Sequence, residues 1–378
     1  MINTASPLSG ENMIAGASTD EVSEKLPQPQ IQNLPAAEKK MGIALVGLGR
    51  YSQKHLGPAL TETVYCRLAG LVSGDAEKCD KWGVEYNLKE KNLYSYKNFD
   101  TIRSNRDIDI VYVAVPNALH AEFVIRAARA GKHVICEKPM ATNLEDCHRM
   151  IDACREAGVK LSMGYRLHFD PFNQEMMRLG QNRVLGSINR IIAKNSFEVG
   201  DKNQWRLKPE LSGGGPLMDI GIYCVQGALY TVGELPVAVR ARFLSKTNPD
   251  KFRDVEEGIE WQMEFPEGII ATCDTSYSKN ENLLRAETVS GWFELNPAFE
   301  YYGLKGQTSE GPVTLTSVNQ QAAQMDDFAL CIQNNGETRV PGEMGLRDLQ
   351  ILLAIYESAR TQKRVELQLQ EFQNLIEI

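Results

Sequence analysis

Three side chains in this sequence have the types and positions that proton and hydride transfer require. Lys138 directly follows an apolar run at 133–136 and Glu137. Because burying an unpaired ammonium group is costly, a lysine at the end of a buried strand should have a partner. Asp219 and Tyr223 are four residues apart, so a helix from about Leu217 would place them on one face. A carboxylate and a phenol that converge in this way suit proton transfer from a hydroxyl group.

Each of these side chains also has a structural alternative. Lys138 could be tied to Glu137 or to the C-terminal end of a helix. Tyr223 could pack a helix whose Asp219 faces solvent. Pro139 fixes the backbone just after Lys138, and a cis peptide bond is one of its options.

A glycine turn near the N-terminus predicts a site for a dinucleotide. Residues 43–52 read I-A-L-V-G-L-G-R-Y-S, so an apolar strand leads into Gly47 and Gly49. Glycines there let the backbone turn tightly and approach a bulky anion. A helix over 51–61 would point its free N–H groups at a pyrophosphate. The third glycine of the usual pattern is replaced by Ser52, so an ordinary tight turn is the alternative.

The end of the second predicted strand indicates which nicotinamide cofactor is used. NAD-preferring sites usually place an acid there to bind the ribose diol, but this chain has Ser73. A hydroxyl accepts a 2′-phosphate without repulsion, and Lys78 could neutralise that phosphate. These residues favour NADP over NAD, although Asp75 could still reach the ribose. Arg50 is either a further phosphate partner or a solvated surface charge.

Alternating strands and helices predict a doubly wound parallel sheet, an α/β Rossmann domain, over residues 41–164. The predicted strands are 43–46, 66–72, 108–115, 133–136 and 160–163. The predicted helical segments between them are 75–87, 98–105, 119–131 and 143–157. In such sheets ligands bind beyond the carboxyl ends of the strands. The glycine turn, Ser73 and Lys138 all follow strand ends, so we expect them to line one edge.

Residues 165–378 predict a second, α+β domain with an open, predominantly antiparallel sheet. The period-two pattern of its strands suggests a sheet with one covered face. The predicted strands are 187–194, 237–244, 258–265 and 268–277, and an amphipathic helix is predicted at 345–360. Residues 1–40 are too poor in apolar side chains to form a core. They predict an N-terminal arm, either a disordered tail or, around 26–31, an extended segment on another surface.

Composition excludes several classes of protein. The net charge of −8 with dispersed Lys and Arg argues against a nucleic-acid surface. Long apolar runs and a secretory leader are both missing from the sequence, so we expect a cytoplasmic protein without a membrane span. If a leader has been removed, the periplasm is the alternative. The eight cysteines lack metal-ligand spacing and predict reduced core thiols and no metal site.

Seven motifs carry a resemblance to a known family. They are G-L-G-R-Y-S (47–52), V-S-G-D-A-E-K (72–78), P-N-A-L-H-A-E-F (116–123), C-E-K-P-M-A-T (136–142), G-Y-R-L-H-F-D-P (164–171), Q-W-R (204–206) and S-G-G-G-P-L-M-D-I-G-I-Y (212–223). Together they resemble the glucose-fructose oxidoreductase family, within the wider group that includes inositol dehydrogenases. The resemblance covers nearly everything from Met41 onward. It implies a Rossmann domain followed by an open sheet used in oligomerisation, hence a homo-oligomer, dimer or tetramer.

The resemblance also implies roles for individual residues. Lys138 matches the family's catalytic lysine, and Asp219 and Tyr223 match its acid and its proton-relay tyrosine. Ser73 and Lys78 fall on positions that hold the adenosine 2′-phosphate, and Trp205 and Arg206 fall near the cofactor. The complete set of expected cofactor-binding residues is Gly47, Gly49, Arg50, Tyr51, Ser73, Lys78, Asn117, His120, Glu137, Lys138, Arg166, Trp205 and Arg206.

The family's activity would be NADP-dependent oxidation of an aldose, with glucose as the expected substrate, at C1 to the lactone. A tightly held NADP would then be reoxidised by a second sugar such as fructose. Secreted members carry a twin-arginine leader and a longer proline-rich arm, which this chain lacks, so NADP could instead dissociate after each turnover. Two other functions stay open: an NAD-dependent glycosidase of the same superfamily without net redox change, and a sugar-sensing regulator without chemistry.

Overall fold

The first sheet of the protein contains six parallel strands. The computed structural model describes residues 40–375, so the predicted arm lies almost entirely outside the described residues. The strands are β1 (Met41–Val46), β2 (Cys66–Ser73), β3 (Leu93–Ser95), β4 (Ile110–Val113), β5 (His133–Cys136) and β6 (Leu161–Met163). Their order is β3-β2-β1-β4-β5-β6, and each neighbouring pair is parallel. The five predicted strands are confirmed, whereas β3 was missed because its three residues stand between charged and polar neighbours and form no apolar run.

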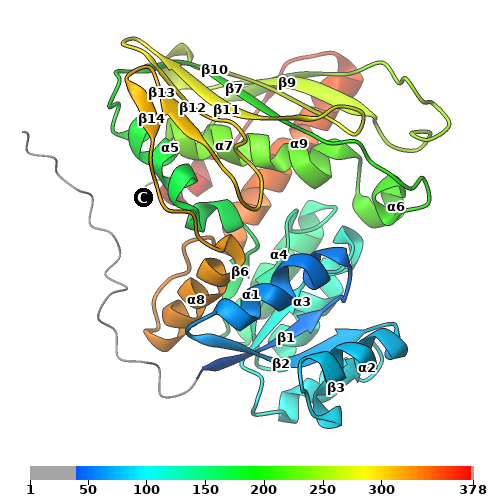
Figure 1. Cartoon of the computed structure of the whole chain (residues 1–378). Coiled ribbons are helices and arrows are strands. Elements are labelled where there is room, and N and C mark those ends of the chain that lie inside the picture. The colour runs from blue at the N-terminus through cyan, green and yellow to red at the C-terminus, as the bar shows by residue number, and fades with distance from the viewer. Residues whose placement is uncertain (1–39, 376–378) are drawn as a thin grey trace, which may run out of the picture. The chain divides into compact units, whose positions relative to one another are not determined.

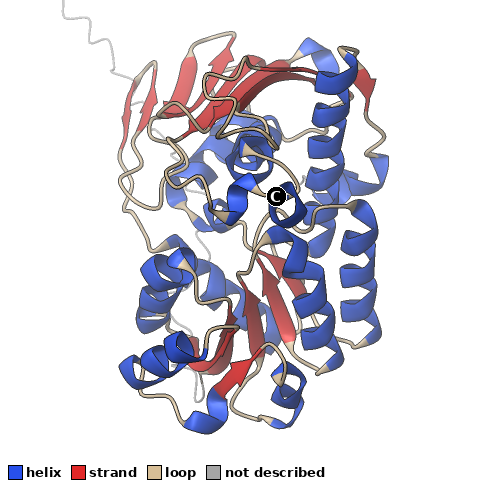
Figure 2. Cartoon of the chain, turned by 90° about the vertical axis from the view of Figure 1, so that its right-hand side faces the viewer, coloured by secondary structure: helices blue, strands red, loops and turns tan. Residues whose placement is uncertain are grey.

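Helices lie on both faces of this sheet (Figure 2). They include α1 (Gly57–Glu62), α2 (Ala76–Glu85), α3 (His120–Arg129) and α4 (Leu144–Glu156). The single helix predicted over 51–61 is wrong in detail. It is a π-helical turn, Ser52–Leu56, followed by α1, and the Gly57 N–H donates to the Ser52 carbonyl five residues back. Pro58 has no N–H to continue the ladder, so the helix restarts there.

The second sheet is mixed and mostly antiparallel, as predicted. Its strands are β7 (Ile188–Ser196), β8 (Ala238–Phe243), β9 (Gly258–Glu264), β10 (Ile270–Ser276), β11 (Glu281–Thr288), β12 (Trp292–Leu295), β13 (Gly306–Thr308), β14 (Gly311–Val313) and β15 (Val365–Glu366). They follow the order β14-β13-β12-β11-β7-β10-β9-β8-β15. The pair β7–β10 is parallel, and the other neighbours are antiparallel.

Helices α5 (Pro171–Gln181), α7 (Ile222–Val232) and α9 (Gly342–Thr361) pack along one face of this second sheet (Figure 1). Helix α9 confirms the predicted amphipathic helix. The short α6 (Pro209–Ser212) precedes the glycine-rich turn at 213–215. Helix α8 (Gln320–Gln333) follows the second sheet in sequence but packs against α1 and β2 of the first domain. Oligomerisation through the second sheet stays a prediction.

The cysteine side chains of the core agree with a further expectation. All eight cysteines are buried and none forms a disulfide, so they are reduced core thiols. Burial raises the pKa of several of these thiols, including Cys147, whose pKa rises to about 12. In residues 40–375, none of the helices has the length and apolar character needed to cross a membrane.

Candidate active site at the carboxyl ends of the first sheet

Lys138 lies just beyond β5 and is joined to Pro139 by a cis peptide bond. Its side chain is only 11% exposed. The ammonium donates a hydrogen bond to the backbone carbonyl of Asp219, and it lies 3.9 Å from Asp219 Oδ1. The buried cation therefore has the partner that its burial requires. Glu137 is not that partner, because only the backbone N–H of Lys138 contacts it, at 3.3 Å.

Asp219 is held by three side chains, those of Lys138, Arg206 and Tyr277. Its Oδ2 accepts hydrogen bonds from Arg206 Nε at 2.8 Å and from the Tyr277 hydroxyl at 3.0 Å. Burial by itself would raise the pKa of Asp219. The positive charges of Arg206 and Lys138 outweigh burial and hold that pKa below its usual value. Asp219 is therefore a fixed carboxylate near neutral pH, and its Oδ1 faces Lys138.

The Lys138 ammonium lies near both Asp219 and the ring of Tyr223. The chain between the two is a π-helical turn, Leu217–Gly221, followed by the start of α7, instead of the single α-helix predicted. The Ile222 N–H donates to the Leu217 carbonyl five residues back, which widens the turn. Lys138 Nζ lies 4.7 Å from the centroid of the Tyr223 ring. The predicted convergence of a carboxylate and a phenol thus takes place around a shared ammonium group.

A buried carboxylate holds the glycine-rich turn that precedes Asp219. Glu256 accepts hydrogen bonds from the N–H groups of Gly215 at 2.9 Å and Leu217 at 3.2 Å, and from the Tyr356 hydroxyl at 2.7 Å. A Cβ at Gly215 would lie 2.6 Å from the Glu256 carbonyl, and one at Gly214 would lie 2.1 Å from the Tyr356 hydroxyl. The glycines are therefore needed for close packing against this clamp.

The turn after β1 contains two glycines, and the surroundings of the two positions differ. Gly47 has a φ of 91°, and a Cβ there would lie 2.5 Å from the Ala114 carbonyl. A Cβ at Gly49 would have open space for 4 Å around it, so packing within the described residues does not require glycine there. Ser52 stands where the third glycine is usual, and its buried hydroxyl donates to the Gly47 carbonyl at 2.6 Å. Ser52 therefore closes the turn itself, and the space at Gly49 stays open.

Ser73 is the last residue of β2. Its hydroxyl accepts a hydrogen bond from the backbone N–H of Asp75 at 3.0 Å. Asp75 caps α2 and accepts from the Lys78 N–H at 3.0 Å. Its carboxylate is also 3.9 Å from the Lys78 ammonium, which is about half exposed. Asp75 is thus occupied at the helix N-terminus, where a carboxylate is favourable.

Two residues that follow β4 support the loops around Lys138. Asn117 donates from its side chain to the Ser212 carbonyl at 2.8 Å, which links the first domain to the glycine-rich turn. The two ring nitrogens of His120 each lie 2.9 Å from a backbone carbonyl, one of Val115 and one of Pro139. The imidazole therefore braces the segment that carries Lys138. The cofactor contacts expected of Asn117 and His120 stay predictions.

Glu137 is a buried acid next to tyrosines. Its Oε1 accepts from the Tyr112 hydroxyl at 2.8 Å. Burial raises the pKa of Glu137, although the nearby ammonium of Lys138 and the hydroxyls of Tyr112 and Tyr51 oppose that effect. Tyr51 is predicted to bind the cofactor and lies in the same cluster. Its contact with a cofactor stays a prediction.

The predicted residues fall into two groups along this edge. Arg206 lies near Asp219 and 4.8 Å from the Trp205 ring, and Arg166 lies 5.0 Å from the Tyr223 ring, so these residues gather around Lys138. Arg50 is exposed on the glycine turn. The glycine turn, Ser73 and Lys78 form the other group, at the ends of β1 and β2.

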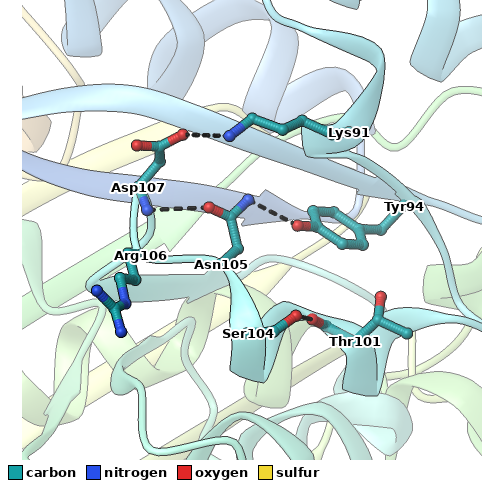
Figure 3. A pocket seen from close by; sticks show the side chains of 7 residues that line it. All are labelled: Lys91, Tyr94, Thr101, Ser104, Asn105, Arg106 and Asp107. Carbon is teal, nitrogen blue, oxygen red and sulfur yellow. Dashed lines mark hydrogen bonds and ion pairs between the residues drawn. The ribbon is translucent and has the colours of Figure 1, made fainter.

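A hollow elsewhere in the first domain holds none of the predicted residues. It is lined by Lys91, Tyr94, Thr101, Ser104, Asn105, Arg106 and Asp107 (Figure 3). These residues lie near the amino ends of β3 and β4, at the edge of the sheet opposite Lys138. Its side chains are tied to one another, as in the 3.1 Å ion pair between Lys91 and Asp107. Among the described residues, no cluster of three or more His, Cys, Asp or Glu side chains could hold a metal ion.

The sheet order and the glycine turn define a Rossmann fold of the nucleotide-binding class. The residues present fit a dinucleotide. The unfilled space at Gly49 leaves room for the backbone approach that a pyrophosphate needs, and Ser73 leaves the β2 end without a free carboxylate. The class of protein is therefore an NAD(P)-binding oxidoreductase, with its candidate reacting groups at Lys138.

Comparisons with known proteins agree with this class. Residues 41–165 match the oxidoreductase family with an NAD-binding Rossmann fold, and residues 173–307 match the GFO/IDH/MocA C-terminal domain. A crystal structure of aldose-aldose oxidoreductase from Caulobacter crescentus is 43% identical, with a TM-score of 0.85, and the match covers 87% of this chain and 100% of that chain.

Two curated relatives extend the comparison. The D-xylose 1-dehydrogenase [NADP(+)] of Haloarcula marismortui is 29% identical over 89% of this chain and 96% of its own length. The D-glucoside 3-dehydrogenase of Escherichia coli is 30% identical over 68% of this chain and 79% of its own length. The chain belongs to the GFO/IDH/MocA family of oxidoreductases.

Sequence reasoning missed two residues of this site. Tyr277 lies just after β10 and reaches Asp219 from 58 positions away in the chain. Glu256 lies 41 positions from Gly215. Neither residue stands in a motif. For Tyr277 the sequence offered one signal, its position at the end of a predicted strand, and for Glu256 it offered none. Such long-range contacts become visible only when the second sheet is folded.

Proposed function

We propose that this protein is an NADP-dependent sugar oxidoreductase that oxidises an aldose at C1 to the lactone. The observation that carries the proposal is the convergence of Asp219 and Tyr223 on the buried ammonium of Lys138. The 43% identity to an aldose-aldose oxidoreductase supports the substrate class. By analogy with that relative, a second sugar would serve as the acceptor.

Each of the three side chains has a role in this proposal. Tyr223 acts as the phenolate, which the Lys138 ammonium stabilises; it takes the proton of the anomeric hydroxyl and becomes the neutral phenol. Asp219 Oδ2 is already occupied by Arg206 and Tyr277, so Oδ1 is the oxygen that accepts a hydrogen bond from a sugar hydroxyl. The glycine turn, Ser73 and Lys78 would hold NADP, which would supply the hydride acceptor when bound. Loss of the hydroxyl proton and of the C1 hydride leaves the C1=O group of the lactone.

The test is the absorbance of the purified protein, together with product analysis. A reduced-nicotinamide band that glucose creates and fructose removes, without added NADP, is the expected result, with lactone as the product. If the band requires added NADP, the enzyme is an ordinary aldose dehydrogenase. Cleavage of an aryl glycoside without net redox change, or sugar binding without any band, would overturn the proposal in favour of a glycosidase or a sensor.

Lys138→Met provides the control for the assignment of the site. Because the variant has no ammonium to stabilise the Tyr223 phenolate, we expect turnover to fall at least about a hundredfold. Full turnover by a folded Lys138→Met variant would show that the reacting groups lie elsewhere.

A further inference from the structure

Arg166 is a buried arginine whose acceptors are all neutral. It follows β6 and is 2% exposed. Its guanidinium donates to the backbone carbonyls of Phe299 at 2.5 Å and Glu300 at 3.0 Å, and to the side-chain oxygen of Gln320. Its Nε is buried and has no hydrogen-bond partner among the described residues. The peptide dipoles that surround Arg166 therefore solvate its charge without neutralising it.

The other fully buried arginine of the second domain has a charged partner. Arg347 pairs with Asp348 at 2.8 Å, as a buried cation usually does. Burial would lower the pKa of Arg166, but the phenol groups of Tyr223 and Tyr301 raise it above its usual value. Arg166 thus stays charged, and its closest ionisable neighbours are tyrosines.

The guanidinium of Arg166 lies between two of these rings. Its Cζ is 5.0 Å from the centroid of the Tyr223 ring and 4.2 Å from that of Tyr301. Lys138 Nζ is 4.7 Å from the same Tyr223 ring. Tyr223 is therefore flanked by two cations. The charge of Lys138 is shared with Asp219, whereas the charge of Arg166 has no such counter-ion among the described residues.

The remaining ionisable groups around Tyr223 do not supply that counter-ion. Glu137 accepts from Tyr112, and Asp219 is held by Arg206 and Lys138. The tyrosines near Tyr223 are Tyr51 and Tyr301, and burial raises the pKa of each.

The elements packed behind α7 present their charged groups to other residues. From β10, Asp274 pairs with Lys194 and Lys279. At the start of α5, Asp170 accepts hydrogen bonds from Asn173 and Gln320. From α9, Asp348 accepts a hydrogen bond from Gln226.

We propose that Arg166 is a positioning residue for Tyr223, whose unneutralised charge stabilises the phenolate form of that tyrosine. This role rests on the proposed function, in which Tyr223 takes the proton of the substrate hydroxyl. Because the charge of Lys138 is shared with Asp219, Lys138 stabilises the Tyr223 phenolate only in part. Arg166 then supplies the rest of that stabilisation. The role is separate from the contact with the cofactor predicted for Arg166.

The test measures the ionisation of Tyr223 directly, from the near-ultraviolet absorbance of tyrosinate during a pH titration. Subtracting the titration of the same protein with Tyr223→Phe isolates this one residue. We expect Arg166→Met to move the Tyr223 midpoint upward by at least about one pH unit, because a positive charge about 5 Å away is removed. Arg166→Lys, which keeps the charge, should restore most of the shift.

Lys132→Met is the matched control. Lys132 is also a buried cation held by backbone carbonyls, those of Asn105 and Ile108, but it lies at the opposite edge of the first sheet. Its loss should leave the Tyr223 midpoint unchanged. If Arg166→Met does not fold, Arg166→Gln, which retains an amide donor for the Phe299 carbonyl, takes its place.

An unchanged midpoint in a folded neutral variant of Arg166 overturns the inference, even if the protein oxidises sugars. A shifted midpoint in a protein that does not oxidise sugars overturns the proposed function alone. In the active enzyme, the acid limb of the kcat/KM profile should move upward with the midpoint, which a purely structural role of Arg166 would not produce.

Discussion

At the scale of single residues, Ser73 and Asp75 together set the charge at the end of β2. Asp75 is the carboxylate nearest to Ser73 in the sequence, and it is used to cap α2. The Ser73 hydroxyl accepts a backbone N–H and keeps its own proton to donate. The β2 end therefore offers a hydroxyl and the half-exposed Lys78 ammonium to a ligand, which favours a 2′-phosphate over a free ribose diol.

We therefore predict that Ser73→Asp reverses the choice of cofactor. A carboxylate at this strand end repels a 2′-phosphate and accepts hydrogen bonds from a ribose diol. The ratio of kcat/KM for NADP to that for NAD should fall at least tenfold, equivalent to about 1.4 kcal/mol. Ser104→Asp adds the same charge to the hollow at the opposite edge of the sheet and should leave the ratio unchanged. An unaltered ratio in Ser73→Asp would mean that the phosphate binds elsewhere.

At the scale of elements, the π-helical turn Leu217–Gly221 determines the position of Asp219, and the side chain of Glu256 holds this turn in place. The carboxylate accepts two N–H groups from the start of the turn and the Tyr356 hydroxyl from α9. Burial raises the pKa of Glu256, and these three hydrogen bonds oppose that effect. Helix α9 is thus connected to Asp219 through a single buried carboxylate.

We predict that Tyr356→Phe loosens this turn. Loss of one buried hydrogen bond to a carboxylate should lower the free energy of unfolding by about 1 to 3 kcal/mol. It should also lower kcat more than it changes KM, because Asp219 is less well positioned. Tyr94→Phe is the control, since the Tyr94 hydroxyl also takes part in one hydrogen bond, a partly buried one that it accepts from Asn105, far from Lys138. Urea unfolding and steady-state kinetics give both values; equal kcat losses in the two variants would contradict the prediction.

The elements that the sequence predicted are those with local patterns. Five of the six strands of the first sheet and the motif residues at their ends could be predicted, because apolar runs, glycines and strand-end residues are visible within a few positions. The π-helical turn at Asp219 could not, since it is a local change in the hydrogen bonding of one helical turn, and five residues show no pattern that distinguishes it from an α-helix. Glu256, just before β9, and Tyr277, just after β10, contact the turn from far along the chain, so no local pattern predicts these contacts.

At the scale of the whole molecule, buried polar networks join α7, α9 and the loop after β6. His168 Nε2 contacts the side-chain oxygen of Gln226 at 2.6 Å, and Gln226 in turn donates to Asp348. Burial lowers the pKa of His168 from 6.5 to about 4. The folded protein therefore keeps this histidine neutral at a pH at which the unfolded chain would protonate it.

We predict that this histidine makes folding stability depend on pH between about 6.5 and about 4. Below 6.5 the unfolded chain binds a proton that the folded protein rejects until the pH approaches the folded pKa, so stability falls as the pH falls. From pH 7 to pH 5 the loss due to His168 should be about 2 kcal/mol. The loss should be smaller by that amount in His168→Gln, whereas His148→Gln, at an exposed site, should behave as the wild type. His120 is also buried, with a pKa lowered to about 4, but it is present in all three proteins and cancels in the comparison. Urea unfolding at both pH values measures the difference, and an equal loss in all three proteins would place the acid sensitivity of the fold in other groups.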